Sequence, residues 1–114
     1  MGNITNAELF GYFVETMSHC GLFLLEAAPL DIEWHLFEEF DGDSITFLHE
    51  NSLAPLLADG YISAEVYSLC LLLRKKFRDM EETSLWNVAS VRTSPEWYEI
   101  MLLADKIRSM INGS

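Results

Sequence analysis

The segment 63–80 most constrains the fold, because its apolar residues recur with the period of an α-helix. Ser63 can accept a hydrogen bond from one of the free backbone N–H groups at a helix start. Four cations lie in the last turns, where the negative end of a helix favours them: Arg74, Lys75, Lys76 and Arg78. The sequence therefore predicts a helix over 64–80, with a buried stripe formed by Val66, Leu69, Cys70, Leu73, Phe77 and Met80.

Two further helices are marked by their start signals. Thr5 and Glu8 have the spacing of a capping box, in which two side chains satisfy free N–H groups at a helix start. Ser94, Pro95 and Glu96 mark another start near the end of the chain. The residues expected to be buried are Phe10, Phe13, Val14 and Met17 on the first helix, and Trp97, Ile100, Met101, Ala104, Ile107 and Ile111 on the second.

The segment between residues 18 and 44 is less regular. Gly21 is expected to end or bend the first helix, and Pro29 interrupts the short apolar segment that follows. Residues 41–44, Asp-Gly-Asp-Ser, are typical of a turn, and Ser44 is expected to cap the element after it.

Residues 31–40 fit two structures. As a strand, the first six residues would alternate and place Ile32, Trp34 and Leu36 on one face. As a helix, the segment would place Ile32, Leu36 and Phe40 on one side. Two glutamates between two phenylalanines then break the alternation, so the pattern favours a helix.

A short helix is expected to begin near Asn51 and to end at Gly60, a residue that readily adopts the left-handed backbone of a helix end. Residues 81–93 are expected to form an irregular connection. No internal repeat or linker interrupts the chain. We therefore expect an all-α fold: a compact single-domain bundle of about five to six helices over residues 1–114.

The two cysteines, Cys20 and Cys70, lie inside apolar stretches without CxxC spacing. They are expected to be free core thiols in a reducing compartment, and one disulfide in an oxidising compartment is the alternative. The apolar run 21–25 is too short to span a membrane, and no basic segment precedes an apolar run as in a secretory signal. The expected location is the cytoplasm.

Charge is distributed unevenly along the chain. The 18 acidic residues outnumber the 7 lysines and arginines, giving a formal net charge of −11. Residues 1–73 hold 12 of the acidic residues and no lysine or arginine, whereas residues 74–114 hold all 7 bases and 6 acids. The two parts therefore carry −12 and +1. We interpret the basic run 74–78 as helix-end charges and internal partners for the acids, not as a nucleic-acid site.

The acidic residues are densest in 31–43. One interpretation is a solvated face that keeps the protein soluble. We favour a surface complementary to a basic partner, because opposed charges speed encounter and set specificity. Trp34 is either an aromatic anchor of that surface or a core residue. Nucleic acid and anionic membranes are disfavoured as ligands. The candidate partner-binding residues are Asp31, Glu33, Trp34, Glu38, Glu39, Asp41 and Asp43.

No motif for catalysis or metal binding stands out. Two pairs with a spacing that can chelate on a helix are Glu15 with His19 and His35 with Glu39. A surface ion pair or hydrogen bond is the more common role of such pairs. Residues 41–43 do not fit a calcium loop, and the chain has no GxSxG motif and no glycine-rich phosphate loop. We therefore expect a binding protein and not an enzyme, with no cofactor and no metal.

The second half of the chain resembles a known family. The segments that carry the resemblance are LLADGYIS at 56–63, which leads into the 64–80 helix, VRTSPEW at 91–97 and LADKI at 103–107. Over about residues 50–111 the pattern is similar to the bacterial immunity proteins of contact-dependent growth inhibition systems.

The resemblance implies a cytoplasmic protein that neutralises the C-terminal domain of one cognate toxin in a 1:1 complex. Toxins of this class are commonly nucleases with basic clefts, which an acidic surface would block. The matching positions are expected to maintain the fold, and the candidate contacts come from 31–43. The alternative is an acidic regulatory adaptor or nucleic-acid mimic that sequesters a basic endogenous protein. A small ligand-binding or catalytic helical domain is a third interpretation.

Overall fold

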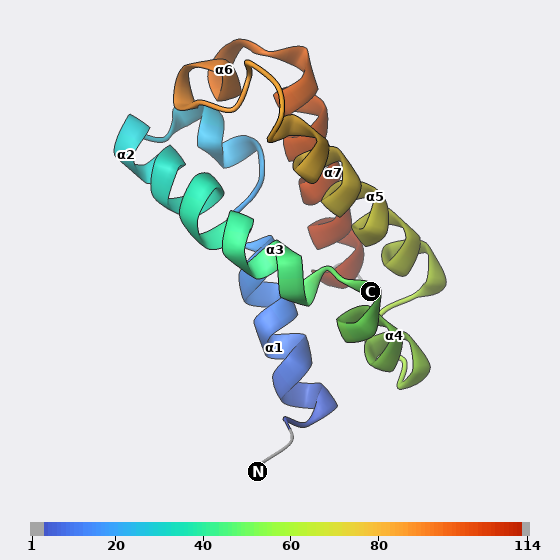
Figure 1. Ribbon diagram of the computed structural model, residues 1–114. Coiled ribbons are helices and arrows are strands. Elements are labelled where there is room, and N and C mark those ends of the chain that lie inside the picture. The colour runs from blue at the N-terminus through green and yellow to red at the C-terminus, as the bar shows by residue number, and fades with distance from the viewer. Residues whose placement is uncertain (1–3, 113–114) are drawn as a thin grey trace.

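The computed structural model describes residues 4–112, and every regular element in that range is a helix (Figure 1). The elements are α1 (Asn6–Met17), the 3₁₀-helix η1 (Leu22–Glu26), α2 (Pro29–Ile32), the π-helix η2 (Glu33–Phe40), α3 (Asp41–Phe47), α4 (Glu50–Ala58), α5 (Ala64–Met80), α6 (Val88–Thr93) and α7 (Pro95–Asn112). The expectation of an all-α bundle is confirmed. None of the helices in residues 4–112 has the length and apolar character that a bilayer crossing requires.

Three elements join into one continuous helix, residues 29–47, which we call the rod (Figure 1). Its junction residues Glu33 and Asp41 keep right-handed helical angles, with φ of −60° and −56°. In η2 the turns widen, and the N–H of Asp41 donates to the carbonyl of Leu36, five residues earlier. The helical interpretation of 31–40 is confirmed, and the strand alternative is wrong.

The predicted turn at 41–44 is also wrong, because these residues continue the rod as the first turn of α3. Ser44 does not cap a later element: it is buried inside α3, and its hydroxyl donates to the carbonyl of Asp41 at 3.2 Å. The rod buries Ile32, Leu36 and Phe40 in the core. Burial of this apolar side outweighs the local turn preference of Asp, Gly and Ser.

Helices α5 and α7 have the predicted starts, and they pack against each other. Ser63 accepts a hydrogen bond from the N–H of Val66 at 3.1 Å, and Ser94 accepts one from the N–H of Glu96 at 3.1 Å. All of the predicted stripe residues of α5 are buried except Leu69, which is half-buried against the core. On α7, Trp97 is fully buried, and its indole N–H donates to the carbonyl of Leu85 at 2.7 Å.

Helix α1 has the predicted capping box but is rotated from the predicted orientation. Thr5 and Glu8 exchange both capping hydrogen bonds. Val14 is 39% exposed, so its assignment to the core was wrong, and Leu9 and Thr16 are buried instead. The buried residues Leu9, Phe13, Thr16 and Met17 form one stripe at helical spacing, and packing against the rod, α4 and α7 turns this stripe, and not Val14, toward the core.

Residues 81–93 are only in part the predicted connection, because 88–93 form α6. Asn87 caps this helix, and its side-chain oxygen accepts a hydrogen bond from the N–H of Ser90 at 2.9 Å. The short helix α4, which comes before α5 in the chain, begins at Glu50, with His49 as its cap. It ends at Ala58, and Gly60, the residue predicted to close it, follows two residues later with the expected left-handed backbone, at a φ of +79°.

The core is one cluster that joins the rod, α1, α5 and α7. Phe40, Phe77 and Trp97 meet edge to face near its centre, with ring centroids 4.9 and 5.8 Å from that of Phe77. Cys20 and Cys70 are buried free thiols, as expected. Burial raises the pKa of each thiol to about 12, so both stay protonated at neutral pH.

All four arginines of the chain reach back from the second part to backbone carbonyls of the first part. Arg92 donates to the carbonyl of Ala27, where η1 ends. Arg108 pairs with Asp105. It also donates to the carbonyl of Met17, the last residue of α1, at 3.0 Å, and to the carbonyl of Cys20 at 2.8 Å. Arg74 and Arg78 bind carbonyls of α3. These contacts join the two parts of the chain, and at Met17 and Ala27 they supply a donor to carbonyls that the end of a helix leaves without one.

Two glycine substitutions test the corrected helix over 41–47 and the left-handed residue that follows α4. Gly42→Ala should stabilise the protein by about 0.5–1 kcal/mol, because alanine favours a helix interior and its Cβ would meet no atom outside the helix within 4 Å. Gly60→Ala should destabilise it by about 1 kcal/mol, because φ is positive there. Urea denaturation measures both effects. A destabilising Gly42→Ala would contradict the continuous rod.

Candidate partner-binding face

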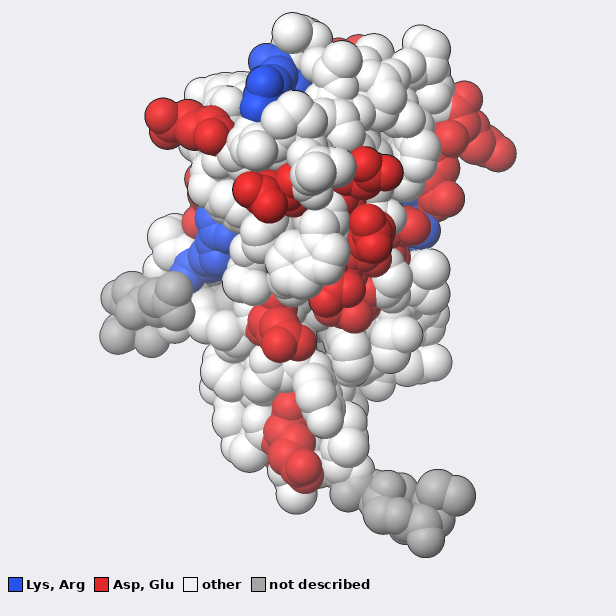
Figure 2. Space-filling model, turned by 90° about the vertical axis from the view of Figure 1, so that its left-hand side faces the viewer, with Lys and Arg blue, Asp and Glu red and all other residues white. Residues whose placement is uncertain are grey.

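The rod lies along one face of the molecule, with α1 packed against its η2 and α3 parts. Viewed from the side on which α2 lies, acidic side chains are spread over the surface, and lysine and arginine side chains show only toward the edges (Figure 2). Of the candidate residues, those that are exposed are Asp31, Glu33, Trp34 and Glu38, and those that are half-buried are Glu39, Asp41 and Asp43.

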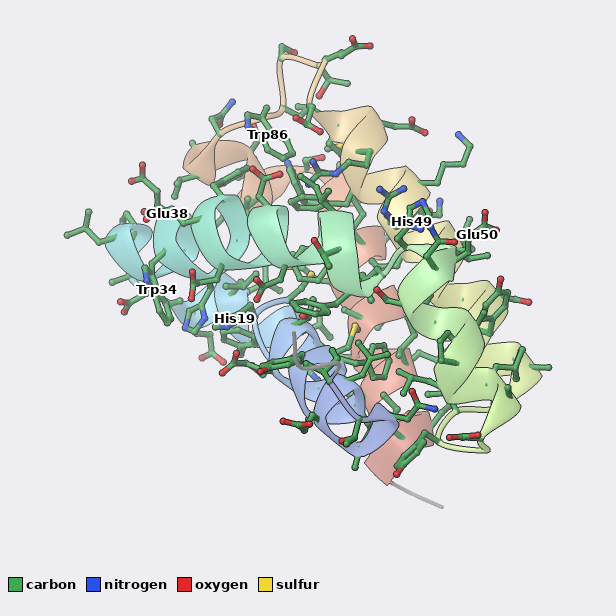
Figure 3. The ribbon with its side chains drawn as sticks, turned by 60° about the horizontal axis from the view of Figure 1, so that its bottom comes forward. His19, Trp34, Glu38, His49, Glu50 and Trp86 are labelled. Atoms are coloured by element: carbon green, nitrogen blue, oxygen red, sulfur yellow. The ribbon has the colours of Figure 1, made fainter. Side chains whose placement is uncertain are left out.

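Trp34 is a surface residue, 46% exposed, so the alternative that it lies in the core is wrong. Its ring meets those of His19 and His35 edge to face, with centroids 5.3 and 4.7 Å away, and Figure 3 shows Trp34 and His19 on the same side of the rod. Leu30, one turn earlier, is 80% exposed. The first turns of the rod therefore present an apolar surface beside the carboxylates of Asp31, Glu33 and Glu38.

Two histidines lie beneath Trp34 and bind each other. The Nδ1 atoms of His19 and His35 are 2.9 Å apart, so one donates to the other and the two rings cannot both be fully protonated in this contact. Burial lowers the pKa of His35, and the neighbouring His19 lowers it further, against the opposing effect of Asp31 and Glu39.

The carboxylates between the rod and α1 are crowded. Burial raises the pKa of Asp43, and the like charges of Glu39 and Glu15 raise it further, whereas His19 lowers it. Among the described residues, no lysine or arginine forms an ion pair with Asp31, Glu33, Glu38, Glu39 or Asp43. This part of the surface therefore has an excess of negative charge that the fold itself does not neutralise.

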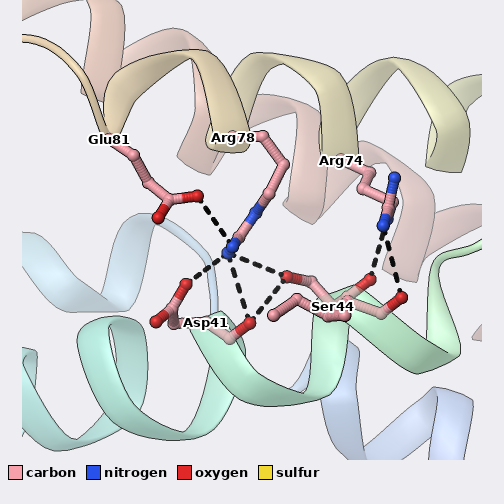
Figure 4. Close-up of polar contacts among 6 residues, drawn as sticks. Asp41, Ser44, Arg74, Arg78 and Glu81 are labelled. Atoms are coloured by element: carbon pink, nitrogen blue, oxygen red, sulfur yellow. Dashed lines mark hydrogen bonds and ion pairs between the residues drawn. The ribbon is translucent and has the colours of Figure 1, made fainter.

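Asp41 points the other way, toward α5 (Figure 4). Arg78 pairs with the carboxylates of Asp41 and Glu81, the latter at 2.8 Å, and also donates to the Asp41 carbonyl at 3.2 Å. Arg74 donates to the carbonyls of Ser44 and Ile45 at 3.2 and 3.3 Å. The expectation of internal partners in the basic run is confirmed for Arg78. Asp41 is thus already bound within the molecule, unlike the other candidate carboxylates.

The two potential chelating pairs do not assemble into a metal site. In residues 4–112, no group of three or more His, Cys, Asp or Glu side chains is arranged to hold a metal ion. His19, the histidine of the first pair, is 7% exposed and hydrogen-bonded to His35 of the second pair. The two pairs therefore meet through their imidazoles.

The histidine contact and the exposed Leu30 were not predicted from the sequence. One signal was available: Asp31, His35, Glu39 and Asp43 recur every four residues, which places them along one side of a helical rod. The other partner, His19, follows the end of α1, and its position depends on how α1 packs.

Comparison of the chain with protein-family models, with curated proteins and with solved structures gives no match. The resemblance to immunity proteins therefore stays a prediction.

Removal of the Arg78 side chain tests the contact between the rod and α5. Arg78→Gln should lower the free energy of unfolding by about 1–3 kcal/mol, because it leaves the half-buried carboxylate of Asp41 without its cation. The matched control is Lys75→Gln, which breaks a pair whose side chains are 72% and 63% exposed and should cost less than about 0.5 kcal/mol. Urea denaturation measures both losses. Equal losses in the two variants would contradict a stabilising contact between Arg78 and the rod.

The histidine contact predicts a loss of stability in mild acid. Because the pKa of His35 in the folded protein lies below its ordinary value of 6.5, the unfolded chain takes up the proton first, and stability falls as the pH drops below 6.5. His35→Gln should show a smaller loss between about pH 7.5 and about pH 5.5 in urea denaturation. An unchanged loss in the variant would assign the pH dependence to other groups.

Proposed function

We propose that the protein is a stoichiometric inhibitor that binds a basic toxin domain of a contact-dependent growth inhibition system and neutralises it. The observation that carries the proposal is a group of carboxylates without a cation of their own chain, next to the exposed Trp34. This arrangement is the electrostatic complement of a lysine- and arginine-rich surface.

A basic partner would relieve a cost that the folded protein carries alone. Burial raises the pKa of Asp43, and repulsion from the carboxylates of Glu39 and Glu15 raises it further. A lysine or arginine placed among them would favour the charged form of each carboxylate. Part of the binding free energy then comes from removing this repulsion. The long-range field of the same charges would also speed encounter at low salt.

Trp34 and Leu30 supply the apolar part of the proposed contact. Both are exposed on the first turns of the rod, and tryptophan is among the residues that most often dominate interface energetics. An arginine of the partner can stack on the indole and donate two hydrogen bonds to a neighbouring carboxylate such as that of Glu38 or Asp31. An aromatic anchor surrounded by carboxylates favours arginine over an apolar partner residue.

The proposed inhibition is steric and electrostatic. If the toxin is a nuclease, its substrate cleft is basic, and an acidic face bound there or at its rim excludes nucleic acid. No chemistry by the inhibitor is needed, so one copy neutralises one toxin domain in the cytoplasm of the cell. The same face would serve an adaptor that sequesters a basic endogenous protein, and genomic context separates the two, because an immunity gene lies just downstream of its toxin gene.

The test uses the toxin domain encoded immediately upstream. Isothermal calorimetry with the purified domain should give a 1:1 complex whose affinity falls as salt rises. The variant Glu38→Lys/Glu39→Lys should bind about 10- to 100-fold more weakly, because two attractive contacts become repulsive. Co-expression with the toxin should restore growth for the natural protein and not for the variant.

The matched control reverses two exposed acids outside the rod and α1, Glu65 in the first turn of α5 and Glu82 in the turn after it, as Glu65→Lys/Glu82→Lys, and so makes the same change in net charge. It should retain most of the affinity. Equal weakening by both variants would mean that only net charge matters and would remove the assigned face. Absence of binding to the upstream domain would reject the immunity function itself.

A further inference from the structure

A second surface lies outside the rod, where α5 and α7 leave an open apolar groove of about 660 Å³. Leu72 and Leu102 in this groove are 42% and 48% exposed, and Leu103 lies beside them. None of its lining residues belongs to the rod or to α1. Exposed leucines gathered in one groove favour a contact with another apolar surface.

The charged side chains around the groove balance one another. Lys76, Lys106, Glu99 and Asp105 line it, and their charges sum to zero in a protein of net charge −11. Asp105 is held by Arg108. Among the described residues, the side chains of Lys76, Glu99 and Lys106 form no ion pair. The groove is thus a part of the surface where two copies of this acidic chain can approach without net repulsion.

The sequence of α7 is self-complementary across this groove. Glu99 lies three residues before Leu102, and Lys106 lies three residues after Leu103. If two copies of α7 cross antiparallel with the leucine pair at a two-fold axis, Glu99 of each copy faces Lys106 of the other. Such an isologous contact places the same patch on both copies and forms every ion pair twice.

We propose that the groove between α5 and α7 binds a second copy of this chain in a two-fold symmetric dimer. Leu72, Leu102 and Leu103 form its apolar centre, and the Glu99–Lys106 pairs fix its antiparallel register. The rod stays outside this contact, so each copy keeps its own partner-binding face. The proposal does not depend on the proposed function.

The first experiment measures mass by analytical ultracentrifugation over a range of protein concentrations. The protein should approach twice its chain mass of 13.0 kDa as concentration rises. Leu102→Glu should keep it at the monomer mass, whereas Leu30→Glu, the same substitution on the rod, should leave the dimer intact. Both leucines are exposed, so neither variant should unfold, and circular dichroism checks this. A monomer at every concentration would overturn the proposal.

Charge exchange tests the register. Each single reversal, Glu99→Lys or Lys106→Glu, places like charges opposite each other twice and should raise the dimer dissociation constant about tenfold. The double variant Glu99→Lys/Lys106→Glu should restore dimerisation, because the exchanged charges again face opposite ones. If the double variant dissociates as the single variants do, or if no reversal has an effect, the antiparallel contact is wrong.

Discussion

The fold depends on arginines that join its two parts. Residues 1–73 carry 12 acidic residues and no lysine or arginine, so every such cation that stabilises them comes from residues 74–114. All four arginines are used in this way, through carbonyls of the rod, of η1 and of the end of α1. The carbonyls of Met17 and Ala27 lie where a helix ends and leaves them without a partner of its own, and a guanidinium with five N–H donors can satisfy several groups at once. The arginines thus stabilise the acidic part of the chain mainly through hydrogen bonds to its backbone, and they leave most of its carboxylates without an ion pair.

This use of the arginines also explains the acidic face. A guanidinium that is committed to carbonyls is not available to the carboxylates between the rod and α1. The lysines do not replace it, because Lys75 pairs with Asp79 in its own helix, and Lys76 and Lys106 lie beside the groove. The raised pKa of Asp43, due first to burial and then to the like charges of Glu39 and Glu15, is therefore not offset by a lysine or arginine ion pair. The excess charge follows from how the fold is held together, and in the proposed complex it is neutralised by the partner.

The sequence predicts what local signals determine. The starts of α1, α5 and α7 and the left-handed Gly60 that follows α4 depend on cap chemistry within a few residues, and each is where the pattern places it. The turn expected at 41–44 fails because its residues prefer turns only in isolation, whereas here they extend a helix whose apolar side is buried. The orientation of α1 and the contact of His19 with His35 depend on packing between distant segments, which no local pattern contains.

In the rod, the local sequence pattern and the packing between distant segments act on the same residues. Its apolar side is buried, so its remaining sides must carry the acids of 31–43. Asp41 faces α5 and Arg78, whereas Asp43, two residues later, lies near Glu39 and the histidine His19 at the other side. Residues two apart on a helix point in nearly opposite directions, so one sequence segment supplies both an internal ion pair and an unpaired surface. Counting charges along the sequence cannot separate these roles. The side of the helix decides which carboxylate stabilises the fold and which is left for a partner.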